Sequence, residues 1–166
     1  MNKITPQELN KNPFDLIGKQ WAMITTKSAD GHVNTMTASW GGVGVLWNKP
    51  VTYIFLRPQR YTRELMDASE TFSTCFLPES YRKELQYCGS HTGREVDKLA
   101  ICGFEAVTLD NTPVLAQSEI AITCRKLFRQ KFNPESFVDP SIDAANYPNK
   151  DYHFFYVGEI LGVYQK

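Results

Sequence analysis

The sequence lacks a long apolar run and an excess of either charge. No segment approaches the ~20 consecutive apolar residues of a membrane-spanning helix, and the first residues lack the apolar core of a signal peptide. Lys and Arg together number 18, as do Asp and Glu, so the formal net charge is zero. Because nucleic-acid-binding proteins usually carry a basic stripe, this balance argues against that class. We therefore expect a cytoplasmic protein that contacts neither a membrane nor a nucleic acid.

Cysteine and histidine are also scarce. None of the four cysteines belongs to a C-x-x-C pair or lies beside a histidine at metal-ligand spacing, so we expect reduced thiols and no metal site. Cys88 is interpreted as a small buried apolar residue. The histidines are too scattered to predict a catalytic triad. We interpret His32 as a turn residue, His91 as a rim residue of a cleft and His153 as a structural hydrogen-bonding residue.

Aromatic residues are abundant, at 13% of the 166 residues, and they gather with β-branched residues in strand-like segments. Helical segments are fewer: residues 62–69, residues 78–87, and a helix that begins at Thr92, where Thr92 and Glu95 match a capping box. Strands are predicted at residues 21–26, 33–40, 51–56, 71–77, 105–109, 119–132 and 153–164.

The helices do not alternate with the strands as they do in a doubly wound sheet. We therefore predict a mainly β (α+β) fold, a closed or nearly closed barrel with a few packed helices, in one domain over residues 1–166. Residues 1–18 are expected to form an N-terminal arm and residues 41–50 a glycine-rich loop. Residues 133–149 are expected to form a long loop or partly helical excursion.

Three short blocks carry the candidate site, and the first is Asn34-Thr-Met-Thr-Ala-Ser-Trp40. In a strand, the side chains of Asn34, Ala38 and Trp40 share one face. The small Ala38 leaves room for a flat ring, and Trp40 offers it an aromatic wall. Backbone amides around Thr37, Ala38 and Ser39 are placed to donate to the polar edge of such a ring. An ordinary half-buried strand is the alternative interpretation.

The second block is Arg57-Pro-Gln-Arg-Tyr-Thr62. Arg57 lies at a strand end, and Arg60 and Thr62 lie where the next helix begins. Free amides and the helix dipole attract anions at such a position. Two guanidinium groups and a hydroxyl there predict a phosphate clamp, and a surface arginine pair beside Pro58 is the alternative.

The third block is Gly93-Arg-Glu-Val-Asp-Lys98. Arg94 and Lys98 lie four residues apart and would share one face of the helix predicted after Thr92. Asp97 lies next to that face and is placed to hold either cation. The block therefore predicts further phosphate contacts, and a solvated helix with incidental charges is the alternative.

The order and spacing of the blocks resemble the flavin reductase-like family, which includes the flavoredoxins and is built on the FMN-binding split barrel. The resemblance covers nearly the whole chain and extends to Tyr-Cys-Gly at residues 87–89 and to Asp151-Tyr-His-Phe-Phe-Tyr-Val-Gly-Glu159. Thr92 stands where the family usually has Ser, and Glu95 where it usually has Asp. Both changes keep the hydroxyl or the carboxylate.

The resemblance implies a Greek-key split barrel of roughly six strands with flanking helices, which works as a homodimer with FMN near the subunit interface. We expect no catalytic side chain, because hydride transfer to a flavin is the cofactor's own chemistry, and no metal. The residues that it implies for FMN binding are Asn34, Thr37, Ala38, Ser39 and Trp40 along the ring and ribityl chain, and Arg57, Arg60, Tyr61, Thr62, Arg94, Asp97 and Lys98 around the phosphate.

The resemblance also implies an oxidoreductase that passes electrons from NAD(P)H through FMN to an unknown acceptor. No G-x-G-x-x-G loop follows a predicted strand, so a nicotinamide would have to stack on the flavin without a dedicated dinucleotide domain. The alternative is a flavoredoxin-like electron carrier that a protein partner reduces and that has no NAD(P)H site. A barrel that binds single-stranded nucleic acid and a flavin-storage or sensing module are further alternatives.

Overall fold

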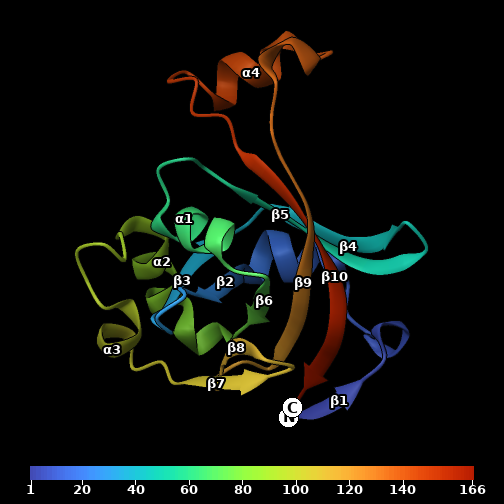
Figure 1. Cartoon of the computed structure of the whole chain (residues 1–166), viewed down its shortest axis with the longest axis vertical. Helices are drawn as coiled ribbons and strands as arrows, with labels where there is room; N and C mark the ends of the chain where they lie inside the picture. The colour runs from blue at the N-terminus through green and yellow to red at the C-terminus, as the bar shows by residue number, and fades with distance from the viewer.

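The computed structural model describes residues 1–166 and contains ten strands, all paired antiparallel. Seven of them lie side by side in one sheet in the order β3-β2-β6-β9-β10-β5-β4. The strand β1 pairs with the C-terminal end of β10 (Figure 1). This sheet comprises β1 (Asn2–Ile4), β2 (Ala22–Lys27), β3 (Val33–Ala38), β4 (Gly41–Leu46), β5 (Lys49–Leu56), β6 (Thr71–Phe76), β9 (Ile120–Lys131) and β10 (Phe154–Gln165).

The sheet curls around a core but does not close. β3 and β4 end the strand order and are not hydrogen-bonded to each other, although only Ser39 and Trp40 separate them in sequence. The long strands β9 and β10 shift register after Val157 and after Ile160, and such irregularities bend a sheet. The expected mainly β split barrel is confirmed.

Helices α1 (Tyr61–Ala68), α2 (Arg82–Ser90) and α3 (Lys98–Cys102) gather on one side of the barrel, beside the hairpin of β7 (Ala106–Leu109) and β8 (Thr112–Leu115) (Figure 1). A short 3₁₀ turn (Glu79–Tyr81) precedes α2. The excursion, residues 133–152, projects from the end of the barrel that lies away from β7 and β8 (Figure 1). It contains a 3₁₀ turn (Pro134–Ser136) and α4 (Pro140–Asn146). No helix is long and apolar enough to cross a membrane.

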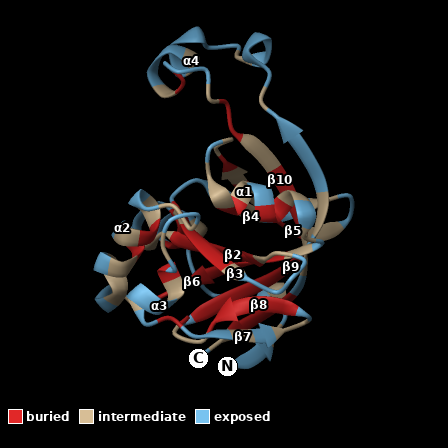
Figure 2. Cartoon of the chain, turned by 60° about the vertical axis from the view of Figure 1, so that its left-hand side comes forward, coloured by how far each residue is buried: buried red, intermediate tan, exposed pale blue.

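Two apolar clusters lie on opposite faces of the central strands. The side chains of β6 alternate between them: Phe72 and Phe76 fill the barrel, whereas Cys75 packs toward α2 and β8. Because both faces of β2, β6 and the first half of β9 are covered, nearly all residues of these segments are buried, while the excursion is largely exposed (Figure 2).

Two predicted irregular segments are ordered elements, so the sheet has more strands than about six. Residues 1–18 are not a detached arm: β1 pairs with β10, and Leu16 and Ile17 are buried in the barrel within a π-helical segment (Asp15–Gln20). Burial of Leu16 and Ile17 removes apolar surface from water and so favours packing of this segment on the barrel. The polar residues around them led to the prediction of an arm.

Residues 41–50 are not a loop either. They form β4, a two-residue turn and the start of β5. Trp47 and Asn48 both have positive φ, as hairpin turns of this kind require. The glycines leave room for a neighbouring ring, because a Cβ at Gly42 would lie 3.3 Å from Tyr53.

The helix predicted at Thr92 begins later. Residues 92–96 form one turn, in which the Glu95 amide donates to the Thr92 carbonyl at 3.2 Å. The helix α3 starts at Lys98, with the Asp97 carboxylate accepting from the Ala100 amide at 3.0 Å. Asp97 is therefore the N-cap of α3. The helix starts where the Asp97 carboxylate caps it, and not at Thr92, where the capping-box pattern predicted it.

Candidate functional site

Two adjoining cavities lie where β3, the start of α1 and the 90–98 segment meet. The strand cavity, about 220 Å³, follows residues 36–40 and is closed by Phe55 and His153. The loop cavity, about 380 Å³, lies between residues 59–62 and the residues Ser90, His91, Thr92, Gly93, Glu95 and Lys98. Met36, Arg57 and Arg60 line both cavities, so the two adjoin and together make up the candidate site.

The free edge of β3 supplies unpaired backbone groups to this site. The Ser28 amide donates to the His32 carbonyl at 2.9 Å, which fixes the β2–β3 register. Even-numbered residues of β3 therefore bond to β2, and the backbone groups of Thr35 and Thr37 point outward. The Thr35 carbonyl accordingly accepts a hydrogen bond from the Lys98 ammonium at 3.1 Å. By the same alternation, the amide of Thr37 lies on the edge beside the strand cavity.

Asn34 supports the site from beneath and lines neither cavity. Its side-chain amide donates to the Thr62 hydroxyl at 2.8 Å, and both residues are buried. Gly93 lies against it so closely that a Cβ there would be 2.1 Å from the Asn34 Oδ1. Asn34 thus joins β3 to the N-terminus of α1 and to the 90–98 segment.

Arg60 is the cation that the site leaves without a partner. Arg60 lines both cavities, and its guanidinium forms no hydrogen bond or ion pair within the protein. Burial, followed by the nearby Arg57 charge, lowers the pKa of Arg60. A guanidinium remains protonated in proteins, so Arg60 presents an uncompensated charge at the start of α1.

Arg57, by contrast, is already engaged by the excursion. It donates to the Asp151 carboxylate at 2.6 Å and to the Asn146 carbonyl at 2.9 Å, and it lies over the Tyr147 ring. A hydrogen bond from Gln59, together with that from Arg57, lowers the pKa of Asp151. Arg57 therefore fixes the excursion to the cavity wall.

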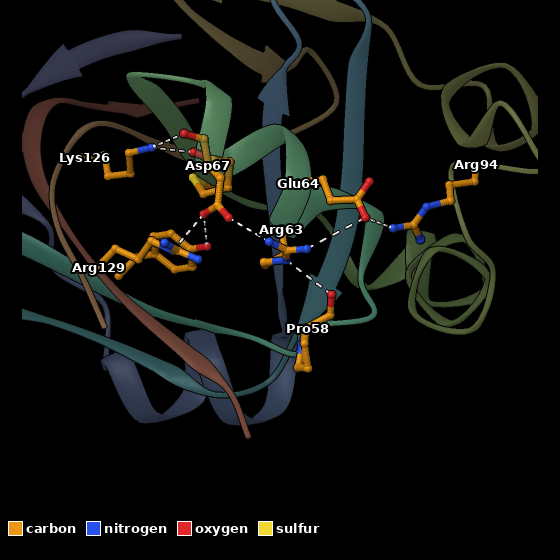
Figure 3. A network of polar contacts seen from close by, with 9 residues as sticks. Pro58, Arg63, Glu64, Asp67, Arg94, Lys126 and Arg129 are labelled. Carbon is orange, nitrogen blue, oxygen red and sulfur yellow. Dashed lines mark hydrogen bonds and ion pairs between the residues drawn. The ribbon is translucent and has the colours of Figure 1, made fainter. Parts of the chain in front are cut away.

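The third block does not act as one helix face, because α3 begins only at Lys98. Arg94 lies outside both cavities, where it pairs with Glu64 (Figure 3). It also donates to the Gln59 carbonyl at 3.2 Å and lies over the Tyr61 ring. Tyr61 itself lines the loop cavity. The predicted roles of Arg94 and Asp97 at the phosphate are thus not supported by their positions.

Lys98 does face the loop cavity, from a buried position. Its ammonium donates to the carbonyls of Thr35 at 3.1 Å and Cys88 at 2.8 Å. Burial lowers the pKa of Lys98 to about 8, although nearby thiols oppose the shift. At neutral pH this lysine is therefore charged but close to its titration range.

Helix α1 is held in place by a network around Asp67, near its C-terminal end (Figure 3). Its carboxylate accepts from Arg63 at 2.8 Å and from the Tyr156 hydroxyl at 2.6 Å, and pairs with Arg129 at 3.0 Å. Lys126 donates to the carbonyls of Met66 and Asp67 at the C-terminal end of the helix. These contacts anchor α1, and with it Arg60 and Thr62, to β9 and β10.

His153 is a cavity residue that the sequence analysis assigned to structure alone. Its Nδ1 is 2.8 Å from the Tyr147 hydroxyl, as a structural role requires. Its ring also packs against Trp40, with the ring centroids 5.1 Å apart, and lines the strand cavity. Burial lowers the pKa of His153 to about 4, so the ring is neutral at physiological pH. Its place at the first residue of a predicted strand was the available signal. His91 lines the loop cavity, as predicted.

Residues 14–166 match the flavin reductase-like domain. The chain belongs to the flavin reductase-like family. Among curated proteins, none matches this sequence.

Solved structures share the fold of this flavin reductase-like protein. A flavoredoxin from Methanosarcina acetivorans is 21% identical with a TM-score of 0.71, covering 100% of this chain and 76% of its own. An FMN-binding protein from Thermus thermophilus with bound p-hydroxybenzaldehyde is 22% identical with a TM-score of 0.70, and the match covers 98% of this chain and 78% of the Thermus chain. An NADH:FAD oxidoreductase from Streptomyces globisporus is 15% identical with a TM-score of 0.64, covering 89% and 75%.

Proposed function

We propose that this protein binds FMN in the joined cavities and passes electrons from NAD(P)H through the flavin to an acceptor. The observation that carries the proposal is the unpartnered Arg60, placed where a cavity beside an aromatic strand end meets a cavity lined by hydroxyls and cations. When bound, FMN would supply the redox chemistry by accepting a hydride and releasing the electrons again.

The strand cavity suits the flavin ring. Trp40 and Phe55 provide aromatic surface, and Ala38 is too small to fill the space between them. The outward amide of Thr37 is placed to donate to the edge of the ring, where reduction increases negative charge. The neutral His153 adds a polar group without a charge of its own.

The loop cavity suits the phosphate. Arg60, Lys98 and the Thr62 hydroxyl line it together with the first residues of α1. Charge-assisted hydrogen bonds from such groups are the strongest that a phosphate can form in a protein. Arg57 can contact the phosphate only if its guanidinium is shared between the phosphate and Asp151 or leaves its ion pair with Asp151.

Anaerobic mixing of the FMN-loaded protein with NADH or NADPH tests the reductant. We expect fast loss of the yellow flavin absorbance with at least one of the two. A second candidate, a flavoredoxin-like carrier reduced by a protein partner, is favoured by the flavoredoxins among the similar structures. Flavin that dithionite bleaches but neither nicotinamide bleaches would support this second candidate.

The affinity for FMN is expected to depend on pH through Lys98. A lysine loses its charge as the pH rises through its pKa, here about 8, and a phosphate loses its second charge below a pH of about 6. The dissociation constant should therefore be lowest between these values and rise on either side. In a fluorescence titration across pH, Lys98→Met should remove the alkaline rise, and the exposed Lys83→Met should keep it. An alkaline rise retained in Lys98→Met contradicts the assignment.

We further propose that the protein is a homodimer whose interface includes an aromatic surface next to the strand cavity. The Phe155 ring of β10 stacks on Phe55 and Tyr53 of β5, with ring centroids 5.3 Å and 5.8 Å apart. Phe128 of β9 meets Phe155 edge-on, with the centroids 6.3 Å apart. These rings are partly exposed, and Phe55 also lines the strand cavity. A second copy on this surface would bury the rings and complete the cavity wall.

Phe155→Asp is expected to convert the dimer to a monomer and to weaken FMN binding, because a carboxylate cannot be buried there without a partner. Sedimentation equilibrium and flavin titration measure the two effects. Ile101→Asp, on an exposed side chain of α3, is the matched control and should leave both unchanged. A monomeric wild type at micromolar concentration contradicts the proposed interface.

A further inference from the structure

Two of the four cysteines face each other between α2 and α3, the helices at either end of the 90–98 segment. The sulfur of Cys88 on α2 is 3.7 Å from that of Cys102 on α3. Cys88 is fully buried and Cys102 is partly exposed. To reach the ~2.0 Å of a disulfide, the two sulfurs would have to approach by roughly 1.7 Å. The other two, Cys75 and Cys124, are buried in the sheet.

The segment between this pair forms one wall of the loop cavity. All six cavity residues from Ser90 to Lys98 lie within the 13 residues that separate the two cysteines. The two ends of the segment are also joined by a polar contact, because the Lys98 ammonium donates to the Cys88 carbonyl at 2.8 Å. A covalent bond between the thiols would therefore fix both ends of the wall.

We propose that Cys88 and Cys102 form a reversible disulfide that locks the 89–101 segment and weakens ligand binding in the loop cavity. The part of this proposal that concerns flavin rests on the function proposed above. The pair is then a site of oxidative modification that adjusts how much flavin the protein holds.

The oxidant is hydrogen peroxide. One source of this peroxide is the reduction of dioxygen by two electrons and two protons. The Cys102 thiolate attacks one peroxide oxygen and breaks the O–O bond. The departing hydroxide takes up the thiol proton, which leaves a sulfenic acid and water. The Cys88 sulfur then displaces the sulfenic hydroxyl, which leaves as a second water with the Cys88 proton. Two thiols have lost two electrons and two protons, and a small dithiol reverses the change.

The environment of the thiols sets the expected rate. Burial raises the pKa of Cys88 to about 12, and the neighbouring thiol contributes; burial also raises the pKa of Cys102. Because the thiolate is the reactive form, oxidation should be slow at neutral pH and faster as the pH rises. Such a pair responds to sustained oxidant and not to brief exposure.

The disulfide disturbs the cavity because the surrounding structure is closely packed. Lys98 is only 3% exposed and is held between two carbonyls, so drawing α2 and α3 together displaces its ammonium. Loss of one charge-assisted contact to a phosphate corresponds to a roughly tenfold weaker affinity.

The test treats the full-length protein with hydrogen peroxide and then with dithiothreitol. Mass spectrometry of peptides identifies the Cys88–Cys102 bond. Hydrogen exchange gives the exchange rate of the backbone amides in the 90–98 segment, and a titration gives the FMN dissociation constant. We expect the bond to form, the exchange of the segment to slow and the FMN affinity to fall about tenfold, all reversed by the dithiol. Cys102→Ala should abolish all three effects, and Cys124→Ala, which leaves the pair intact, should keep them.

Oxidation of Cys102 to a sulfinic acid without a bond to Cys88 overturns the proposal. So does a disulfide that leaves hydrogen exchange and FMN affinity unchanged. If the reduced wild type does not bind FMN, the proposed function fails, and peptide mass and hydrogen exchange on the same samples still decide whether the disulfide locks the segment.

Discussion

Arg60→Ala is expected to weaken FMN binding by about 1–3 kcal/mol, or roughly 5- to 150-fold. Arg60 is the cation that lines both cavities and has no partner of its own in the protein. Its replacement should therefore remove a contact to the phosphate without leaving a protein carboxylate unpaired. Fluorescence titration of FMN at pH 7 measures the loss, and Arg60→Lys should recover part of it because a point charge remains.

Arg94→Ala is the matched control for this prediction. Both residues are arginines near the start of α1, but Arg94 pairs with Glu64 outside the cavities. An exposed pair of this kind contributes little, so the FMN affinity should change by less than about twofold. Equal losses in the two variants would contradict the assignment of Arg60 as the main phosphate ligand.

Gly158→Ala is expected to destabilise the fold by about 1–3 kcal/mol or more, the cost of forcing a methyl group into a packed core. A Cβ at Gly158 would lie 2.5 Å from the Phe72 ring and 2.8 Å from the Cys124 Cβ, at a register shift of β10. Neither neighbour can retreat, because both are fully buried. Urea denaturation followed by circular dichroism measures the change in the free energy of unfolding.

Gly18→Ala is the control for crowding, because no atom lies within 4 Å of a Cβ at Gly18. Its helical position should favour alanine slightly. If Gly158→Ala is as stable as the wild type, β10 can shift without loss, and the close packing of the barrel at that strand would be disproved.

Local sequence patterns were sufficient for most of the strands. Residues 51–56 and 71–76 are rich in β-branched and aromatic side chains and lie in β5 and β6. Such periodicity is a property of neighbouring residues, so it can be read without the fold. The same approach failed at β1 and β4, which are short and polar or glycine-rich. The strand β1 forms by pairing with β10, and β4 forms by pairing with β5, where Gly42 lies opposite Tyr53. A prediction from neighbouring residues in the sequence does not include these pairing partners.

The site shows the same division. The sequence by itself determined the family, the barrel and the presence of cations in three blocks. The tertiary structure decided which cation is free: Arg57 is held by Asp151, 94 residues away, and Arg94 by Glu64, 30 residues away, which leaves Arg60. The identity of a charge is written in the sequence, whereas its partner depends on long-range contacts that exist only after the chain has folded.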